Sequence, residues 1–169
     1  RLALDLDIQN RERQALTKEL TDKARSIALA GSRNTPLIFV ADPAFKAGVV
    51  GLVAGRLTEE FYRPAIIVER GETESRGSCR SIPEFHITRA LDECKELFMH
   101  HGGHAAAAGF TIQTSNLDTL ASRMHAIAEI IEHIHDKGKV WFATLEEIAL
   151  HVKKVTDEGT YKPRVHTLP

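Results

Sequence analysis

The fold is decided by residues 37–68, which read LIFVADPAFKAGVVGLVAGRLTEEFYRPAIIV. The apolar runs at 37–41 and 65–68 each predict a short buried strand. Between them, residues 48–61 place apolar side chains at helical spacing and predict a helix. A strand, a helix and a second strand in succession are typical of an α/β fold.

The flanking sequence extends this pattern. Residues 2–29 predict one long helix, because apolar side chains recur in it at near-helical spacing. We expect further strands at 76–82 and 106–113, and helices at 87–99 and from about Asn116 to Asp136. The predicted fold class is therefore α/β, a mixed sheet flanked by helices and preceded by a long connector helix.

The composition indicates a globule with a real core, since 43% of the 169 residues are hydrophobic and 27% are charged. The net charge is −1, so nucleic-acid binding would require a local basic patch. No run is long enough to span a bilayer, and we expect no membrane partner. Cys79 and Cys94 lack zinc-ligand spacing and are expected to be buried free thiols in a reducing cytoplasm.

Three glycines lie on one face of the predicted helix at 48–61, namely Gly48, Gly51 and Gly55. Each costs about 1 kcal/mol against alanine in a helix interior. Either close packing on the sheet or a ligand that approaches the backbone would explain them. Arg56 follows directly, and it is either a solvated surface residue or a contact to a bound phosphate.

The segment Arg76-Gly77-Ser78-Cys79-Arg80-Ser81 combines charge with hydroxyl groups. On a strand, Ser78 and Arg80 face the same side. A guanidinium beside hydroxyl donors suits phosphate binding. The alternative is the polar outer face of an edge strand.

The segment Gly102-Gly103-His104, followed by four alanines, Gly109 and Phe110, is the strongest candidate site. Two glycines after a helix permit positive φ angles, and their N–H groups would then form an anion-binding concavity beside His104. The small side chains that follow would let a large ligand lie against the strand. A helix C-cap followed by a small-residue packing strand is the alternative.

The closely spaced His100, His101 and His104 also raise the possibility of a metal site, but such ligand sets usually include carboxylates or cysteines. Metal-dependent phosphodiester cleavage needs several carboxylates around its ions, and the sequence has no Asp-His-His or Asp-x-Asp cluster. We therefore predict neither catalytic residues nor a metal or other cofactor site in this chain.

Several of these stretches together resemble the RecJ-type single-stranded-DNA-specific exonucleases of the DHH phosphoesterase superfamily. The resemblance covers about residues 5–120, and it is carried by residues 10–14, 48–57, 63–65, 76–81 and 102–110. It implies a DHH-associated domain that binds single-stranded DNA. The family's catalytic lobe, with its Asp-His-His motif and manganese or magnesium ions, would be the partner of this domain and is not in this chain.

The resemblance also implies which residues contact nucleic acid. The family's arginine–serine and glycine–glycine–histidine motifs map onto Ser78, Arg80 and Ser81 and onto Gly102, Gly103 and His104. Many relatives have Trp-His just before the glycine-rich helix, where this chain has Phe45-Lys46. Lys46 and Arg56 complete the predicted set of phosphate contacts. The implied setting is DNA repair and recombination in the cytoplasm.

We divide the sequence into a connector helix at 1–30, a nucleic-acid-binding domain at 31–122, and C-terminal helices with a loosely ordered tail at 123–169. From about Arg123 onward the chain resembles the C-terminus of polysaccharide-deacetylase-like proteins instead, with a helix expected at 145–155.

Two other functions stay open on the sequence alone. The chain could belong to a DHH-superfamily phosphodiesterase that acts on nanoRNA or a cyclic dinucleotide, or it could be a structural piece that binds nothing. Competition between a dinucleotide and a long single strand would separate the first alternative from the exonuclease.

Overall fold

The structure is a computed structural model that describes residues 2–30, 35–136, 150–151, 153–154 and 157. The chain divides into a first compact unit, Arg1–His133, and a second, Ile134–Pro169. The expected helix at 145–155 falls largely outside the described residues.

A five-stranded mixed sheet forms the centre of the first unit, which confirms the predicted fold class. Its order is β1-β2-β3-β5-β4, and only β1 and β2 are parallel. The strands are β1 (Ile38–Asp42), β2 (Ala65–Glu69), β3 (Glu74–Arg80), β4 (Phe98–His104) and β5 (Ala107–Gln113).

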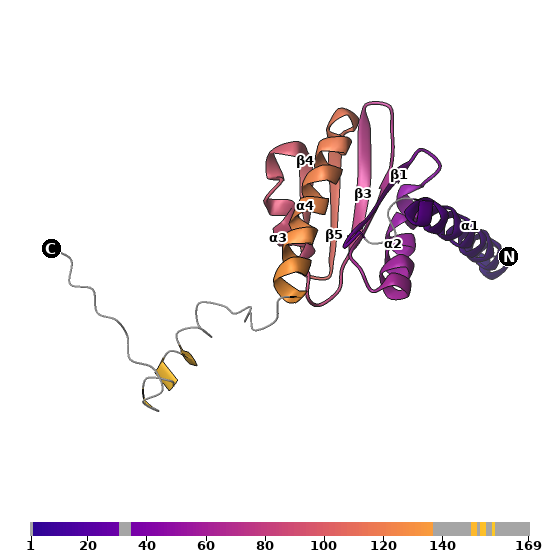
Figure 1. Ribbon diagram of the computed structural model, residues 1–169. Coiled ribbons are helices and arrows are strands. Elements are labelled where there is room, and N and C mark those ends of the chain that lie inside the picture. Colours follow the sequence, from indigo (N-terminus) through magenta and orange to yellow (C-terminus); the bar gives the residue numbers. More distant parts are fainter. Residues whose placement is uncertain (1, 31–34, 137–149, 152, 155–156, 158–169) are drawn as a thin grey trace. The chain divides into compact units, whose positions relative to one another are not determined.

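Helices cover both faces of the sheet (Figure 1). The long helix α1 (Leu2–Ala30), predicted from the sequence, and α2 (Ala47–Phe61) lie on one face. The short helix α3 (Ile87–Asp92) and the long helix α4 (Leu117–Asp136) lie on the other. Two 3₁₀ turns, η1 (Lys95–Leu97) and η2 (Thr114–Asn116), precede β4 and α4.

Each face of the sheet has its own apolar core. On the α1–α2 face, Ile38, Val40 and Ile67 pack with Val53 and Leu57 of α2. The opposite core joins β2, β3 and β5 to α3 and α4, and its fully buried side chains include Ile66, Ile87, Leu91, Ile112, Leu120 and Met124. Burying one such aliphatic side chain contributes about 1.5–3 kcal/mol, so the two cores fix which strand positions face which helix layer.

Both cysteines are buried free thiols, as expected. Burial raises the pKa of Cys79 to about 12, so its thiol stays protonated near neutral pH. Among the described residues, none of the helices has both the length and the apolar character that crossing a bilayer requires.

The predicted helix at 87–99 is wrong in its second half. The helix α3 ends at Asp92, and after the η1 turn the chain becomes β4, a strand absent from the sequence prediction. The reason is tertiary: the ring of Phe98 packs against those of His101 and Phe110, and residues 98–104 pair with the open edge of β5. The helix α4 also crosses the boundary between residues 122 and 123 at which the sequence was divided into domains.

Candidate nucleic-acid interface

The strand β3 supplies the first polar row of the candidate site. Its buried residues Ser75, Gly77 and Cys79 face the α3–α4 side, so the alternating positions Arg76, Ser78 and Arg80 face the α2 side. The Arg80 guanidinium Nη1 donates to Ser78 Oγ at 3.3 Å and to the Cys79 carbonyl at 2.8 Å. The prediction that Ser78 and Arg80 share a face is confirmed.

The strand β4 places the glycine–glycine–histidine motif in a sheet, and not in a turn after a helix. Gly102 pairs with Gly109 and Gly103 with Ala108, so the predicted backbone concavity at a helix end is wrong. The conformation at Gly103 nevertheless requires glycine: its φ is +154°, and a Cβ there would lie 2.3 Å from the Ala107 carbonyl oxygen.

The registers of β3, β5 and β4 align three rows of residues on the α2 side of the sheet. Residues paired across antiparallel strands share a face. The rows are Arg80–Ala107–His104, Ser78–Gly109–Gly102 and Arg76–Thr111–His100. We call these nine residues the grid.

The grid is an accessible surface. Polar side chains of β3 and β4 form its two rims, and the small residues Ala107, Gly109 and Gly102 form its floor. Its β4 residues are exposed, and those of β5 are partly exposed. Because neighbouring strands lie about 4.8 Å apart, the arginines of β3 and the histidines of β4 form rims about 10 Å apart. The central row contains only a serine and two glycines, and a Cβ at Gly102 would contact nothing within 4 Å.

The glycine face of α2 borders the grid along β3. A Cβ at Gly51 would lie 3.1 Å from Ser78 Oγ and 3.2 Å from Arg80 Nη2, and a Cβ at Gly55 would lie 4.0 Å from Arg80 Cγ. Packing on the sheet therefore explains Gly51. Gly48 has open space in front of it, which packing does not explain.

Hydrogen bonds from Ser81 and from the first residues of α3 hold the turn between β4 and β5. Thr88 Oγ1 donates to the His104 carbonyl at 2.6 Å, and the amide of Ile87 donates to the Ala105 carbonyl at 3.0 Å. The Ser81 amide donates to the Ala106 carbonyl at 2.9 Å, and its hydroxyl donates to the Phe85 carbonyl at 2.6 Å. Ser81 thus supports the loop that positions His104.

The histidines divide between the two faces of β4. His100 and His104 belong to the grid, whereas His101 faces α3 and its Nε2 lies 2.9 Å from Asp92 Oδ1. Within the described part of the chain, no three His, Cys, Asp or Glu residues are grouped so that they could hold a metal ion.

The remaining predicted contacts, Arg56 and Lys46, lie off the grid. Arg56 lines a hollow between α1 and α2 with Arg25 and Glu60. Lys46 precedes α2 and lines a polar hollow that reaches Arg76. Sequence reasoning missed His100 and Thr111 as site residues, and strand alternation in β5 would have indicated Thr111.

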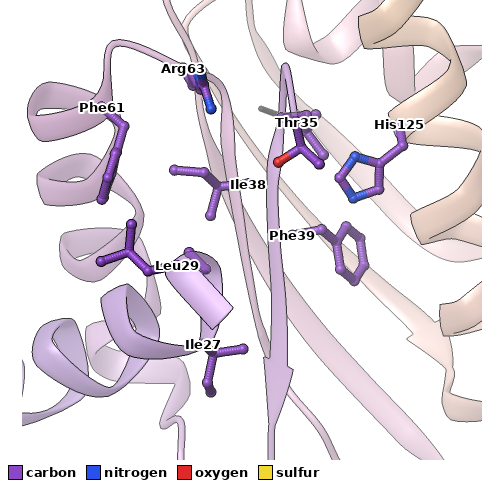
Figure 2. A pocket seen from close by; sticks show the side chains of 10 residues that line it. Ile27, Leu29, Thr35, Ile38, Phe39, Phe61, Arg63 and His125 are labelled. Carbon is purple, nitrogen blue, oxygen red and sulfur yellow. The ribbon is translucent and has the colours of Figure 1, made fainter. Parts of the chain in front are cut away.

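A further hollow, of about 230 Å³, lies beside β1 and is mainly apolar (Figure 2). Phe39, Phe61 and His125 line it together with the end of α1. It contains none of the predicted contact residues.

Comparison with known proteins places this geometry in a family. Residues 34–132 match the DHHA1 domain. The chain is 38% identical over 130 residues to the single-stranded-DNA-specific exonuclease RecJ of Bacillus subtilis, which covers 76% of this chain and 16% of that protein. It is 31% identical to RecJ of Escherichia coli, with 72% of this chain and 23% of that protein covered.

Solved structures agree. The crystal structure of RecJ from Thermus thermophilus with Mg²⁺ superposes with a TM-score of 0.66 at 29% identity, covering 74% of this chain and 19% of that chain. A RecJ structure bound to manganese gives a TM-score of 0.64 at 28% identity, covering 74% of this chain and 31% of that one.

The chain thus spans roughly a sixth to a third of these relatives. The resemblance of the segment after Arg123 to polysaccharide deacetylases finds no support in the comparisons. With the domain match, the RecJ homologues and the shared fold in agreement, the chain belongs to the DHHA1 domain family and is homologous to RecJ exonucleases.

Proposed function

We propose that the grid binds the sugar–phosphate backbone of single-stranded DNA, as the substrate-binding part of a RecJ-type exonuclease. The observation that carries the proposal is the arrangement of Arg80 and Ser78 opposite His104, across a floor of alanine and glycine. A guanidinium fork and a hydroxyl are strong phosphate ligands, and the low floor leaves room for the strand.

The charge of the grid favours an anion. Its nine positions hold two arginines and two histidines and no carboxylate. In the described part of the chain no carboxylate pairs with Arg80, whose hydrogen bonds go to a hydroxyl and a carbonyl. Such contacts position a backbone without reading bases, so we expect little sequence preference and a steep dependence on salt.

In this proposal the cleavage chemistry belongs to a separate DHH lobe with manganese or magnesium ions, and the present domain holds the strand for it. The RecJ relatives support this division, because the chain matches a limited part of their length. We extend the proposal to action in the cytoplasm in DNA repair and recombination.

Fluorescence anisotropy with a labelled oligothymidylate tests the proposal. Arg80→Ala should weaken binding about tenfold or more, since a hydrogen bond to a charged group is worth about 1.5–3 kcal/mol. His104→Ala should weaken it less. Arg89→Ala, which removes an exposed arginine from α3 on the opposite face, is the matched control.

Equal affinities for the Arg80→Ala, His104→Ala and Arg89→Ala proteins would contradict the proposal. If an unlabelled dinucleotide competes as well as a long strand, the phosphodiesterase alternative is favoured instead.

A further inference from the structure

The hollow next to Lys46 holds a group of cations that the grid does not include. Its volume is about 410 Å³, and it lies where the parallel strands β1 and β2 end and α2 begins. In open α/β sheets, ligands bind outside the carboxyl ends of the strands. The residues that line it are Pro43, Lys46, Glu69, Arg70, Gly71, Glu74 and Arg76.

Three of these residues are exposed cations without a partner. Among the described residues, the side chains of Lys46, Arg70 and Arg76 make neither a hydrogen bond nor an ion pair. The contrast is with Lys23 and Arg25, each of which pairs with a carboxylate within 2.7 Å. Three cations converging on one hollow indicate a site for an anion.

The two carboxylates in the hollow do not cancel this charge. Glu69 Oε2 accepts the amide of Ala47 at 3.0 Å, so that carboxylate is engaged in capping α2. Glu74 is exposed at the start of β3, and its side chain makes neither a hydrogen bond nor an ion pair with the residues that the structure describes. Three positive and two negative groups leave the hollow with an excess of one positive charge.

Arg76 joins the hollow to the grid. It lines the hollow and also begins the grid row Arg76–Thr111–His100. Successive rows are about 6.7 Å apart along the strand, so a backbone that follows β3 from Arg80 to Arg76 arrives at the hollow. The hollow is therefore the continuation of the grid beyond its last row.

We propose that this hollow is a second phosphate subsite, in which Lys46 and Arg70 bind a phosphate of the same strand that lies on the grid. The proposal rests on the proposed function. It predicts that the hollow determines how long a strand the domain binds. Arginine forks bind phosphate through paired hydrogen bonds, which suits Arg70 and the shared Arg76.

The test compares oligothymidylates of about 4 and about 12 nucleotides, both within the range of common single-strand site sizes. In the Lys46→Ala/Arg70→Ala protein, the longer strand should bind about tenfold more weakly. Its salt slope should fall by about 0.7, because one phosphate contact on a single strand is lost. Affinity for the short strand should be unchanged, because the double variant leaves the grid intact.

Two further variants sharpen the result. Arg89→Ala/Lys95→Ala removes two exposed cations from the α3 side and should change neither affinity. Glu74→Gln removes a negative charge from the hollow and should strengthen binding of the longer strand about twofold to fivefold.

The subsite is refuted if the double variant in the hollow weakens both lengths equally, or neither. Failure of the proposed function is a separate result: Arg80→Ala would then leave affinity for the short strand unchanged. Thermal melts of the Lys46→Ala/Arg70→Ala, Arg89→Ala/Lys95→Ala and Glu74→Gln proteins should match the parent chain, because the replaced side chains make no hydrogen bond or ion pair with the described residues.

Discussion

Arg80 and Ser78 are joined by a hydrogen bond beneath Gly51, with 3.3 Å between Nη1 and Oγ. The Cys79 carbonyl accepts a second bond from the same guanidinium nitrogen. These contacts hold the arginine against the sheet before any ligand binds, which lowers the entropic cost of binding. Gly51 thus sets the space in which the two phosphate-binding groups of β3 lie.

Gly51→Ala should weaken DNA binding while leaving the fold intact. The added Cβ would lie 3.1–3.2 Å from Ser78 Oγ and Arg80 Nη2, so these flexible groups must shift by a few tenths of an ångström. We expect a threefold to tenfold loss of affinity, about 1 kcal/mol. Alanine in the helix should at the same time raise the free energy of unfolding by up to about 1 kcal/mol.

The matched control for this variant is Gly55→Ala. It offers the same gain in helix propensity, but its Cβ would lie 4.0 Å from Arg80, an ordinary contact. Anisotropy titrations and denaturant melts of both proteins check the prediction. Equal affinity of the two variants would show that the position of Arg80 beneath α2 does not matter for binding.

Gly102 and Gly103 should respond in opposite ways to alanine. A Cβ at Gly102 meets nothing, so Gly102→Ala should fold normally yet weaken binding by filling the floor of the grid. A Cβ at Gly103 would collide with the Ala107 carbonyl at a strained φ, so Gly103→Ala should lower the free energy of unfolding by about 2 kcal/mol or more.

Urea melts together with DNA titrations separate the two effects. If Gly102→Ala binds DNA as tightly as the parent chain, the floor of the grid does not need to be low for binding. If Gly103→Ala melts at the same urea concentration as the parent chain, the strand does not require glycine at this position.

Most strands and helices were predictable because local patterns and tertiary packing agree in them. The runs at 37–41 and 65–68 form β1 and β2. Side chains on both faces of these strands are apolar, as expected of strands that helices cover on both faces. Ser78 and Arg80 share a face because strand alternation alone dictates it. Neither feature required knowledge of which strands pair in the sheet.

The strand β4 could not be predicted for a physical reason. Residues 98–104 are mostly histidine and glycine, and most of them are exposed, so the apolar alternation that marks a half-buried strand is missing. Their conformation follows from pairing with β5 in a hairpin whose register shifts between Phe98 and His100. The rows of the grid depend on that register, so His100 could not be recognised from sequence as a neighbour of Thr111.

Thr88→Val should loosen the turn that carries His104. The hydroxyl of Thr88 donates to the His104 carbonyl at 2.6 Å, and valine keeps the shape of the side chain without that bond. We expect a loss of about 1 kcal/mol of stability and a small loss of DNA affinity. Amide hydrogen exchange should accelerate in residues 104–107, and Thr88→Ser should restore the parent's rates. Unchanged exchange in the valine variant would mean that the turn is held by the backbone bonds alone.

His125 should make the stability of the domain depend on pH. Its side chain lines the apolar hollow of Figure 2, and its Nδ1 atom is buried without a hydrogen-bond partner among the described residues. Burial lowers the pKa of His125 below 6.5, and the charge of Glu129 offsets this only in part. The folded state therefore favours the neutral imidazole.

The sign of the effect follows from proton linkage. Below pH 6.5 the unfolded chain binds a proton at His125 more readily than the folded chain does, so stability is lost as the pH falls through the lowered folded pKa. Thermal melts from about pH 7.5 to about pH 5 should show a declining Tm in the parent chain. His125→Leu should decline less, because leucine removes the titrating group and its unpaired nitrogen. His133→Gln, which replaces an exposed histidine on the same helix, should follow the parent. Parallel Tm curves for the His125→Leu protein and the parent would show that burial of this imidazole has no thermodynamic consequence.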